Sequence, residues 1–370
     1  MLPSKKPGLS GRWYVLLLLI PAAALMLLAV QFPAFAEWYA VYPYRILSYW
    51  GNALSSLVPF SIAEALVVLL IPAILIYLIA AFIKTKRAAQ KRKAALTYFV
   101  IQPLCAVSLL FFLFTITCGI NYHRYTFAET SGLSIQPADV EELEALCEKL
   151  AADVNTLRSQ IKTDDTGVMK LNAPGIYSVS QRAQSAMNAA GREYPLLSGN
   201  FGGPKPVFFS RVMSACDTTG IFIPFTMEAN VNVDISPYAI PATMCHELAH
   251  LNGFMREDEA NFIATLACAA SEDPDFQYSG KMLSYRYVSN ALYGEDPQAA
   301  QEIASTLNEG VRLDLQANSD YWKQFEGPLS ETATQVNNAY LKANRQEDGV
   351  KSYGRIVDLL LAEYRSGKMK

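Results

Sequence analysis

Three long apolar runs, almost free of charge, dominate the first third of the chain. They extend over residues 13–30, 62–83 and 96–119. A bilayer has a hydrocarbon core about 30 Å thick, which about 20 apolar residues cross as a helix. The runs therefore predict three transmembrane helices. One proline interrupts each run, and membrane helices tolerate this where neighbouring groups satisfy the freed backbone.

The first run has a rival interpretation as a signal peptide. Lys5, Lys6 and Arg12 precede it, and residues 34–36 read Ala-Phe-Ala, which resembles a small-residue cleavage site. Its apolar stretch is longer than the usual core of a signal peptide, and two further runs follow. We therefore favour an uncleaved membrane anchor.

After residue 119 the long apolar runs end, and apolar residues recur at the spacing of amphipathic helices or short strands. Helical spacing of apolar residues predicts helices over residues 137–161, 179–191, 282–293, 299–307, 331–343 and 353–364, and a further helix that begins near Ile240. Short apolar stretches predict strands over residues 206–210, 220–224 and 229–233. Alternation within residues 227–234 indicates a half-exposed strand at a sheet edge. The pattern predicts a mostly helical α+β domain with a small mixed sheet.

The basic residues predict the orientation in the membrane. The connection between the second and third runs is crowded with Lys84, Lys86, Arg87, Lys91, Arg92 and Lys93, whereas residues 31–61 carry only Arg45. Short basic segments stay in the cytoplasm. The amino terminus is then cytoplasmic, and three crossings deliver the rest of the chain outside. We expect a membrane domain over residues 1–119 and an extracytoplasmic domain over residues 120–370, in the cytoplasmic membrane.

The membrane part and the outer part of the chain also differ in net charge. Residues 1–95 carry a formal charge of +8, so the chain's −3 leaves −11 for the remainder. An acidic outer domain argues against nucleic acid as a partner. The lipid bilayer is one expected partner, and the pattern indicates no oligomeric state. The outer domain holds four cysteines, so a disulfide is possible but not required.

The strongest chemical signal is the sequence His-Glu-Leu-Ala-His at residues 246–250, an HExxH motif. On a helix, His246 and His250 leave the same face and can share one Zn²⁺ ion. Glu247 then lies beside the metal, where it can take a proton from activated water as a general base. The chain holds three histidines, and two are here.

A catalytic zinc site uses three protein ligands and keeps a fourth position open. Gly253 is a plausible helix stop, and a second helix that begins near Glu257 would run back past the first. We expect Glu257 to be the third ligand, with Glu259 as its rival. Asn261, one turn beyond Glu257, can fix the ring of a ligating histidine.

The pattern HExxH followed by ExxAN resembles the gluzincins, zinc peptidases whose third ligand is a glutamate. Two features depart from that family: Asn261 stands where an aspartate is commoner, and the gap from His250 to Glu257 is short. A metzincin site is excluded because its third ligand would be Arg256, which cannot bind zinc. The resemblance implies a zincin-like fold in which an edge strand binds the substrate peptide.

Peptide hydrolysis also needs a donor for the developing oxyanion. Tyr287 is the preferred candidate, and Tyr285 and Arg286 beside it, or Tyr353 and Arg355, are alternatives. No motif distinguishes these five residues.

Along its length the chain also resembles an uncharacterised family of bacterial membrane proteins with a gluzincin-like domain after three spans. We expect a membrane-anchored zinc metalloendopeptidase that acts on a peptide or protein substrate outside the cytoplasmic membrane. A catalytically silent zincin-fold sensor, or a structural zinc protein, is the leading alternative. A transport component is disfavoured because the runs contain no paired intramembrane charges.

Overall fold

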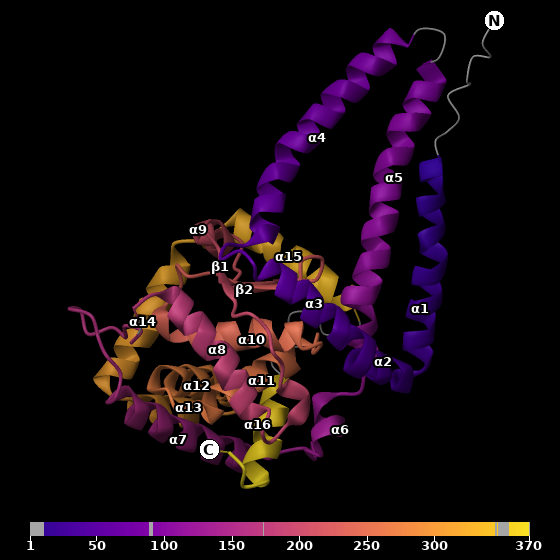
Figure 1. Ribbon diagram of the computed structural model, residues 1–370. Coiled ribbons are helices and arrows are strands. Elements are labelled where there is room, and N and C mark those ends of the chain that lie inside the picture. Colours follow the sequence, from indigo (N-terminus) through magenta and orange to yellow (C-terminus); the bar gives the residue numbers. More distant parts are fainter. Residues whose placement is uncertain (1–10, 89–91, 173, 345, 347–354, 370) are drawn as a thin grey trace, which may run out of the picture.

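The computed structural model describes residues 11–88, 92–172, 174–344, 346 and 355–369. It consists of long apolar helices that project from one side of a mostly helical body, which contains a small sheet (Figure 1). The C-terminal end lies on the side of the body remote from these helices.

The three apolar runs are confirmed as helices long and apolar enough to cross a membrane, over Trp13–Gln31, Ile62–Arg87 and Ala95–Thr117. The first consists of the 3₁₀ helix η1 (Gly11–Leu18) and α1 (Leu19–Gln31). The others are α4 (Ile62–Arg87) and α5 (Arg92–Thr117). Most of their side chains are exposed, as expected for groups that face lipid. The chain is therefore a membrane protein.

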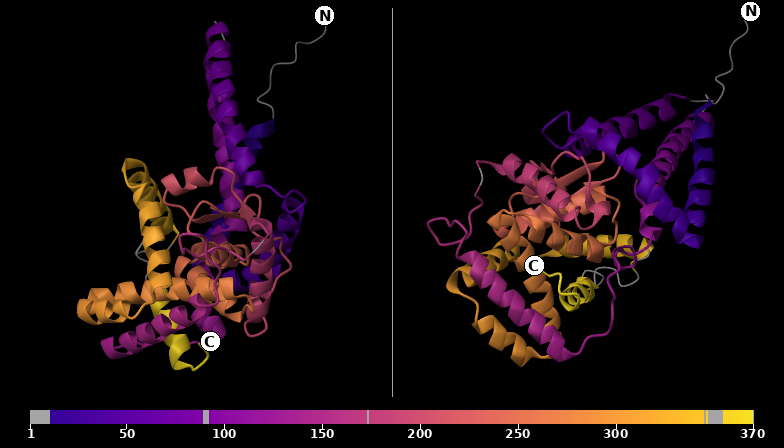
Figure 2. Two further views of the ribbon diagram at one scale, coloured as in Figure 1. Left: turned by 90° about the vertical axis from the view of Figure 1, so that its left-hand side faces the viewer. Right: turned by 60° about the horizontal axis from the view of Figure 1, so that its bottom comes forward.

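The spans are not packed as one bundle. The first lies along α5, where the Ser108 hydroxyl donates to the Val15 carbonyl oxygen (2.9 Å). α4 meets α5 at the end remote from the body, where Tyr77 donates to the Phe99 carbonyl oxygen (2.6 Å). Nearer the body, α4 stands apart from α1 and α5 in two views (Figures 1 and 2).

The connection between the first two spans is helical, with α2 (Pro33–Tyr39), the π-helix η2 (Ala40–Tyr44) and α3 (Arg45–Ser55). One face of α3 is buried and polar. There, the Asn52 side chain donates to the Met227 carbonyl oxygen (2.8 Å) and accepts from the Gly202 N–H (2.7 Å). These bonds attach the connection to the body across the boundary predicted after residue 119.

The sheet has the order β1 (Lys205–Pro206), β3 (Glu228–Val231), β2 (Gly220–Ile223). β1 is parallel to β3 and β2 is antiparallel to it. The sequence prediction of an edge over residues 227–234 is wrong, since β3 is central and β2 is an edge. The asparagines of that stretch do not face water: Asn230 and Asn232 are buried and donate to backbone carbonyl oxygens.

Helices make up the rest of the body. The short ones are η4 (Gly119–His123), α6 (Phe127–Ser131), η5 (Pro195–Leu197), α9 (Ser210–Ala215) and η6 (Pro237–Ala239). The longer ones are α7 (Val140–Arg158), α8 (Ile176–Ala190), α10 (Ile240–Leu251), α11 (Glu257–Ala270), α12 (Pro274–Glu295), α13 (Pro297–Ser305), α14 (Glu309–Lys323), α15 (Pro328–Ala343) and α16 (Ile356–Arg365). The core is centred on α10 and α11, which pack against each other and against α8 and α12.

Candidate metal centre

Helix α10 carries the HExxH sequence through the centre of the body. Pro241 stands in its first turn, where the missing N–H costs no helical hydrogen bond. The Ala242 N–H, one of the free donors of that turn, is satisfied by the Ser279 hydroxyl of α12 (2.9 Å). Gly253 ends the helix with a φ of +91°, a left-handed conformation that favours glycine. The helix position is therefore fixed at both ends.

The turn after Gly253 brings Glu257, the first residue of α11, back to the two histidines. Nε2 of His246 lies 3.0 Å from Nε2 of His250. Oε2 of Glu257 lies 3.2 Å from Nε2 of His246 and 3.6 Å from Nε2 of His250. Three potential ligand atoms thus converge on one point.

The outer nitrogens of both rings have acceptors. Nδ1 of His246 lies 2.9 Å from Oδ1 of Asn261, and Nδ1 of His250 lies 2.8 Å from the Phe254 carbonyl oxygen. A carbonyl oxygen only accepts, so each Nδ1 is the donor. In the neutral rings, Nε2 then carries a free lone pair directed to the common point. This is the arrangement that orients histidine ligands in metal sites.

Glu247 projects from the same helix beside the histidines and is 3% exposed. Its carboxylate accepts a hydrogen bond from the Phe222 N–H of β2. Its Oε2 is buried and has no hydrogen-bond partner among the described residues. Gly220 leaves the room that this carboxylate occupies, because a Cβ there would lie 2.4 Å from Oε1. Phe222 and Gly220 of β2 therefore adjoin this carboxylate beside the two histidines.

Burial and neighbouring charges shift the pKa values of these groups. Burial raises the pKa of Glu247 to about 7. For His250, burial favours the neutral ring, but the Glu257 carboxylate outweighs it and raises the pKa to about 9. For Glu257, burial opposes ionisation, but the two histidines outweigh it and hold its pKa well below the usual range. The cluster therefore favours positive charge at the point where its ligand atoms meet.

The three residues fit a divalent metal ion. Their ligand atoms all lie within 4.8 Å of one another. A tetrahedral zinc ion with bonds of about 2.0–2.1 Å separates its ligands by about 3.3–3.4 Å, close to the distances above. The unpartnered oxygen of Glu247 lies beside this cluster. Two imidazoles and one carboxylate form a donor set typical of catalytic zinc.

A comparison with protein families identifies the group to which the chain is related. Residues 39–361 match DUF3810, described as a protein of unknown function. The chain belongs to this family. The match includes α4, α5 and all three residues of the candidate cluster, but not the first span. No curated protein and no solved structure matches the chain.

The rival ligand of this DUF3810 protein, Glu259, lies elsewhere. Its Oε1 accepts from the Phe127 N–H (2.9 Å) and from the Arg256 side chain (2.8 Å). The neighbouring Asp258 is also turned to other partners: it pairs loosely with Arg355 (4.0 Å), and burial raises its pKa to about 6. The structure brings together Glu257, and not Glu259, with the histidines.

The candidate oxyanion donors differ in how close they lie to the cluster. The Tyr287 hydroxyl accepts from the Asn261 amide (3.2 Å). Asn261 also bonds His246, so it links Tyr287 to that histidine. Tyr285 is buried in the core, and Arg286 is exposed on the same helix. Arg355 pairs with Asp258 rather than pointing to the cluster, and Tyr353 lies outside the described residues. Tyr287 is thus the one of the described candidates that contacts the histidine network.

Sequence reasoning missed several neighbours of the cluster. Gly220 and Phe222 of β2 support Glu247, as described above. Tyr340 of α15 lies close enough to Glu257 for its pKa to be affected, and the Gln346 side chain accepts from the Glu257 N–H (3.3 Å). Among these neighbours, only Gly220 had a signal in the sequence, as a glycine at the start of an apolar stretch. The others reach the site through tertiary contacts that no local pattern records.

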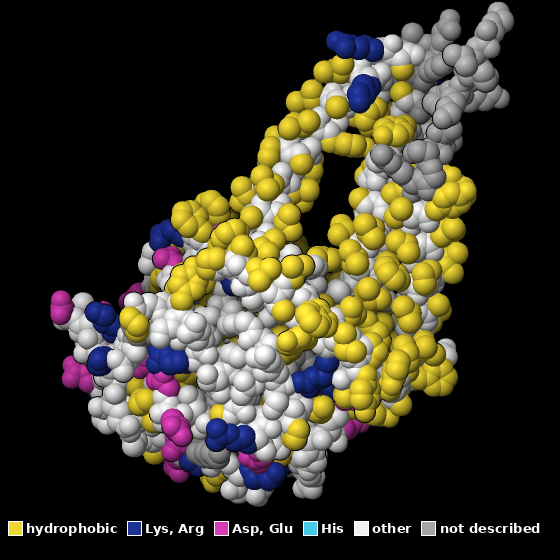
Figure 3. Space-filling model, in the orientation of Figure 1, with side chains coloured by type: hydrophobic (Ala, Val, Ile, Leu, Met, Phe, Trp, Pro, Cys, Tyr) yellow, Lys and Arg dark blue, Asp and Glu magenta, His cyan; other side chains and the backbone are white. Residues whose placement is uncertain are grey.

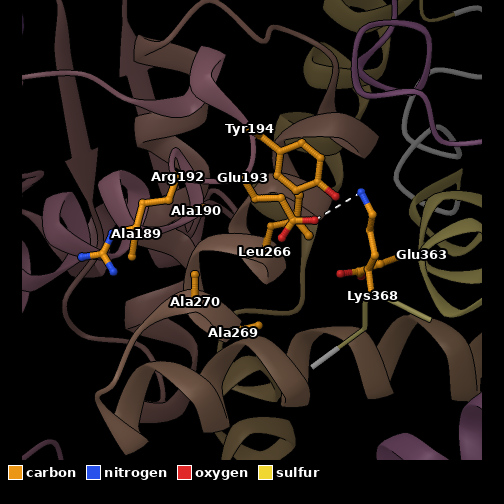
Figure 4. A pocket seen from close by; sticks show the side chains of 10 residues that line it. All are labelled: Ala189, Ala190, Arg192, Glu193, Tyr194, Leu266, Ala269, Ala270, Glu363 and Lys368. Atoms are coloured by element: carbon orange, nitrogen blue, oxygen red, sulfur yellow. Dashed lines mark ion pairs between the residues drawn. The ribbon is translucent and has the colours of Figure 1, made fainter. Parts of the chain in front are cut away.

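A surface cavity of about 140 Å³ in this DUF3810 protein is separate from the cluster. It lies between the end of α8, the end of α11 and the C-terminal residues (Figure 4), and Glu193 pairs with Lys368 across it (3.3 Å). None of the metal-cluster residues lines it. The cavity is therefore not part of the candidate site.

Proposed function

We propose that this protein is a membrane-anchored zinc metallopeptidase that hydrolyses peptide bonds outside the cytoplasmic membrane. The observation that carries the proposal is the convergence of His246, His250 and Glu257 beside a buried, partly unpartnered Glu247. A structural zinc site has no use for a free carboxylate at that position, because such sites are closed by four protein ligands.

His246, His250 and Glu257 are the residues that would hold the ion. A zinc ion bound there supplies a Lewis acid that lowers the pKa of water towards about 7 and polarises the peptide carbonyl. Asn261 and the Phe254 carbonyl group keep both histidine rings in the tautomer that binds metal. The Arg256–Glu259 pair (2.8 Å) stabilises the turn that delivers Glu257.

Glu247 acts as the general base. Its free oxygen accepts the proton of the attacking water, and the same carboxylate then delivers the proton to the leaving nitrogen. The Phe222 N–H and the space above Gly220 keep the carboxylate in place during both transfers. Tyr287 is the proposed donor to the oxyanion, because it is already linked to His246 through Asn261.

The substrate binds as an extended strand. One edge of β2 pairs with β3, and the other pairs with no strand in the described part of the chain. Because β2 also supports Glu247, a peptide added to that edge would pass beside the base. This arrangement is the reason for assigning the body to a zincin-like fold.

The body faces the outside of the cell in this proposal. Its support is the basic cluster at the end of α4 that is remote from the body, which includes Lys84, Lys86 and Arg87. The resulting topology places the amino terminus in the cytoplasm and the metal cluster on the extracytoplasmic side.

The experiment uses purified full-length protein. We expect about one zinc ion per chain and cleavage of members of an unbiased peptide library, measured by metal analysis and mass spectrometry. A chelator should stop cleavage, and added zinc should restore it. Zinc-loaded protein that cleaves nothing across the library would instead support the silent zincin-fold sensor or structural zinc protein.

A further inference from the structure

Exposed aromatic side chains form a collar where the spans meet the body. We define the collar as Trp38, Trp50, Phe60, Phe208 and Phe209, all of which are exposed. Phe208 is 85% exposed, although the backbone N–H groups of Phe208 and Phe209 are fixed on the Glu64 carboxylate of α4 (3.0 and 2.7 Å). Apolar side chains cover this face of the body (Figure 3). Tryptophan is enriched at membrane–water interfaces, so Trp38 and Trp50 favour a position of this part of the collar at the lipid headgroups.

One wall of the metal cluster is joined directly to the second span. The carboxylate of Glu228, at the start of β3, is buried and accepts from the first N–H groups of α4, those of Ile62 (3.0 Å) and Ala63 (2.8 Å). Lys205 of β1 neutralises this carboxylate (2.5 Å). β2 lies beside Glu247 and pairs with β3. Because β3 is bonded to the first residues of α4, only β3 separates β2 from the membrane end of that helix.

The opposite wall is joined to the third span. Cys118 directly follows α5, and its Sγ lies 3.7 Å from Sδ of Met255, two residues before Glu257. Tyr340 of α15 packs against the Phe114 ring of α5 (6.5 Å between centroids) and also lies beside Glu257. The helix that provides the third ligand thus begins at the membrane end of α5.

The metal helix itself is bonded to the connection between the first two spans. The Tyr44 hydroxyl lies 3.3 Å from the His250 carbonyl oxygen and 3.2 Å from that of Leu251. Three elements around the cluster, β3, the start of α11 and the end of α10, therefore contact the start of α4, the end of α5 and the connection between the first two spans. Short chains of contacts thus join the cluster to the start of α4 on one side and to the end of α5 on the other.

The two spans on either side of the cluster leave room beside them. Their described contact lies at the remote end, between Tyr77 and Phe99, and the space-filling view shows open space between α4 and α5 nearer the body (Figure 3). On α4, this part carries exposed apolar side chains: Leu66, Val67, Leu70 and Ile71. Lipid or an apolar helix is the only neighbour that suits such a surface within a bilayer.

From this placement we propose, on the basis of the proposed function, that the substrate is a membrane-anchored polypeptide cleaved just outside its transmembrane segment. The anchor lies in the bilayer beside α4 and α5, and the stretch that follows it enters the cluster along β2. Anchoring confines the substrate to the plane that contains the site, which raises its effective concentration without any new contact.

The position of the cut follows from the depth of the site. One helical layer is about 10 Å thick, and an extended chain advances about 3.4 Å per residue. A peptide therefore reaches the cluster within about 3 to 10 residues of its membrane span. Soluble polypeptides have no such constraint on where they are cut.

The test uses the full-length protein in vesicles of phosphatidylethanolamine and phosphatidylglycerol. The tethered probe is an apolar helix of about 20 residues followed on the body side by a randomised tail of about 20 residues. The soluble probe is the same tail alone. We expect the tethered tail to be cut at least about tenfold faster, with cuts clustered in its first 10 or so residues. Equal rates, or cuts spread evenly along the tail, would overturn this inference and leave the proposed function intact.

A binding measurement separates the inference from catalysis. Benzoylphenylalanine at position 221, an exposed residue of β2, is introduced into the Glu247→Gln protein, and the matched control carries it at position 293, an exposed residue of α12. We expect light-induced crosslinks from position 221 to the tethered probe and few to the soluble one. Such crosslinks without cleavage by the native protein would contradict the peptidase and retain the membrane-anchored ligand. Crosslinks from position 221 that form equally with the tethered and the soluble probe would contradict the inference.

Discussion

Glu257 and Glu259 stand two residues apart on α11 and serve different purposes because their side chains meet different partners. Glu257 faces two imidazole nitrogens, whereas Glu259 accepts from the Phe127 N–H and Arg256. The sequence predicted that one acidic residue here would join the histidines, since both begin the same helix. It favoured Glu257 and kept Glu259 as a rival, because the contact that turns Glu259 away is made by α6, more than a hundred residues earlier in the chain.

The two carboxylates should therefore separate metal binding from stability. Glu257→Ala removes a ligand, and we expect zinc to be lost while the fold is retained. Glu259→Ala should keep zinc and lower the free energy of unfolding by about 1.5–3 kcal/mol, because a buried charged hydrogen-bond acceptor is removed. Metal analysis and denaturant unfolding measure the two effects. Zinc lost from Glu259→Ala and kept by Glu257→Ala would move the third ligand to Glu259.

Gly220 offers a way to displace the base without touching a ligand. In Gly220→Ala the new Cβ would lie 2.4 Å from Oε1 of Glu247, so the carboxylate must move. A shift of about 1 Å in a reacting group can cost about a hundredfold in rate, and we expect a loss of that order in kcat with zinc retained. Gly294→Ala is the matched control, because its Cβ meets open space. Equal activity of the two variants would show that Gly220 does not position the base.

Among the elements, long periodic helices were predicted well and irregular ones poorly. The predictions over residues 137–161, 179–191, 282–293 and 299–307 are confirmed by α7, α8, α12 and α13. The chain beyond Pro274 was expected to be helical, but α14 was given no bounds of its own, because its buried face carries Asp314 and Asn318 beside Val311 and shows no apolar stripe. The predicted strand over residues 206–210 is mostly wrong. Its two phenylalanines are exposed in the aromatic collar instead of being buried in a sheet.

α14 depends on one buried ion pair. Asp314 is fully buried and accepts from Arg158 (2.7 Å), the Tyr278 hydroxyl (2.7 Å) and the Met169 N–H (2.7 Å). We expect Asp314→Ala to reduce stability by about 3–5 kcal/mol, because it leaves the buried Arg158 unpaired. Asp320→Ala, on the exposed side of the same helix, should change stability by less than about 0.5 kcal/mol. Similar unfolding midpoints for the two variants would contradict this role for the pair.

For the molecule as a whole, the sequence predicted the three membrane helices and the local part of the site. Apolar length determines a span, and HExxH places two histidines on one helix face, so neither depends on distant contacts. The way the spans are joined to the site was not predictable. It depends on pairs such as Tyr44 with His250, which are more than two hundred residues apart.

The orientation of the molecule remains a prediction, and it has a direct test. The basic cluster between α4 and α5 should stay in the cytoplasm, so the body lies outside. Alkaline phosphatase, which is active only outside the cytoplasm, should be active when fused after Ser134 and inactive when fused after Lys86. A cytoplasmic reporter at the same positions should give the opposite pattern. Active phosphatase after Lys86 with none after Ser134 would reverse the topology.

One comparison tests the peptidase most directly: native protein against Glu247→Gln, with zinc content and cleavage of the same peptide library measured on each. The amide is nearly the same size and can still accept from the Phe222 N–H, but it cannot take a proton. We expect both proteins to bind about one zinc ion and the variant to cleave at least about a hundredfold more slowly. Equal cleavage by the two proteins would contradict the role of Glu247 as the base.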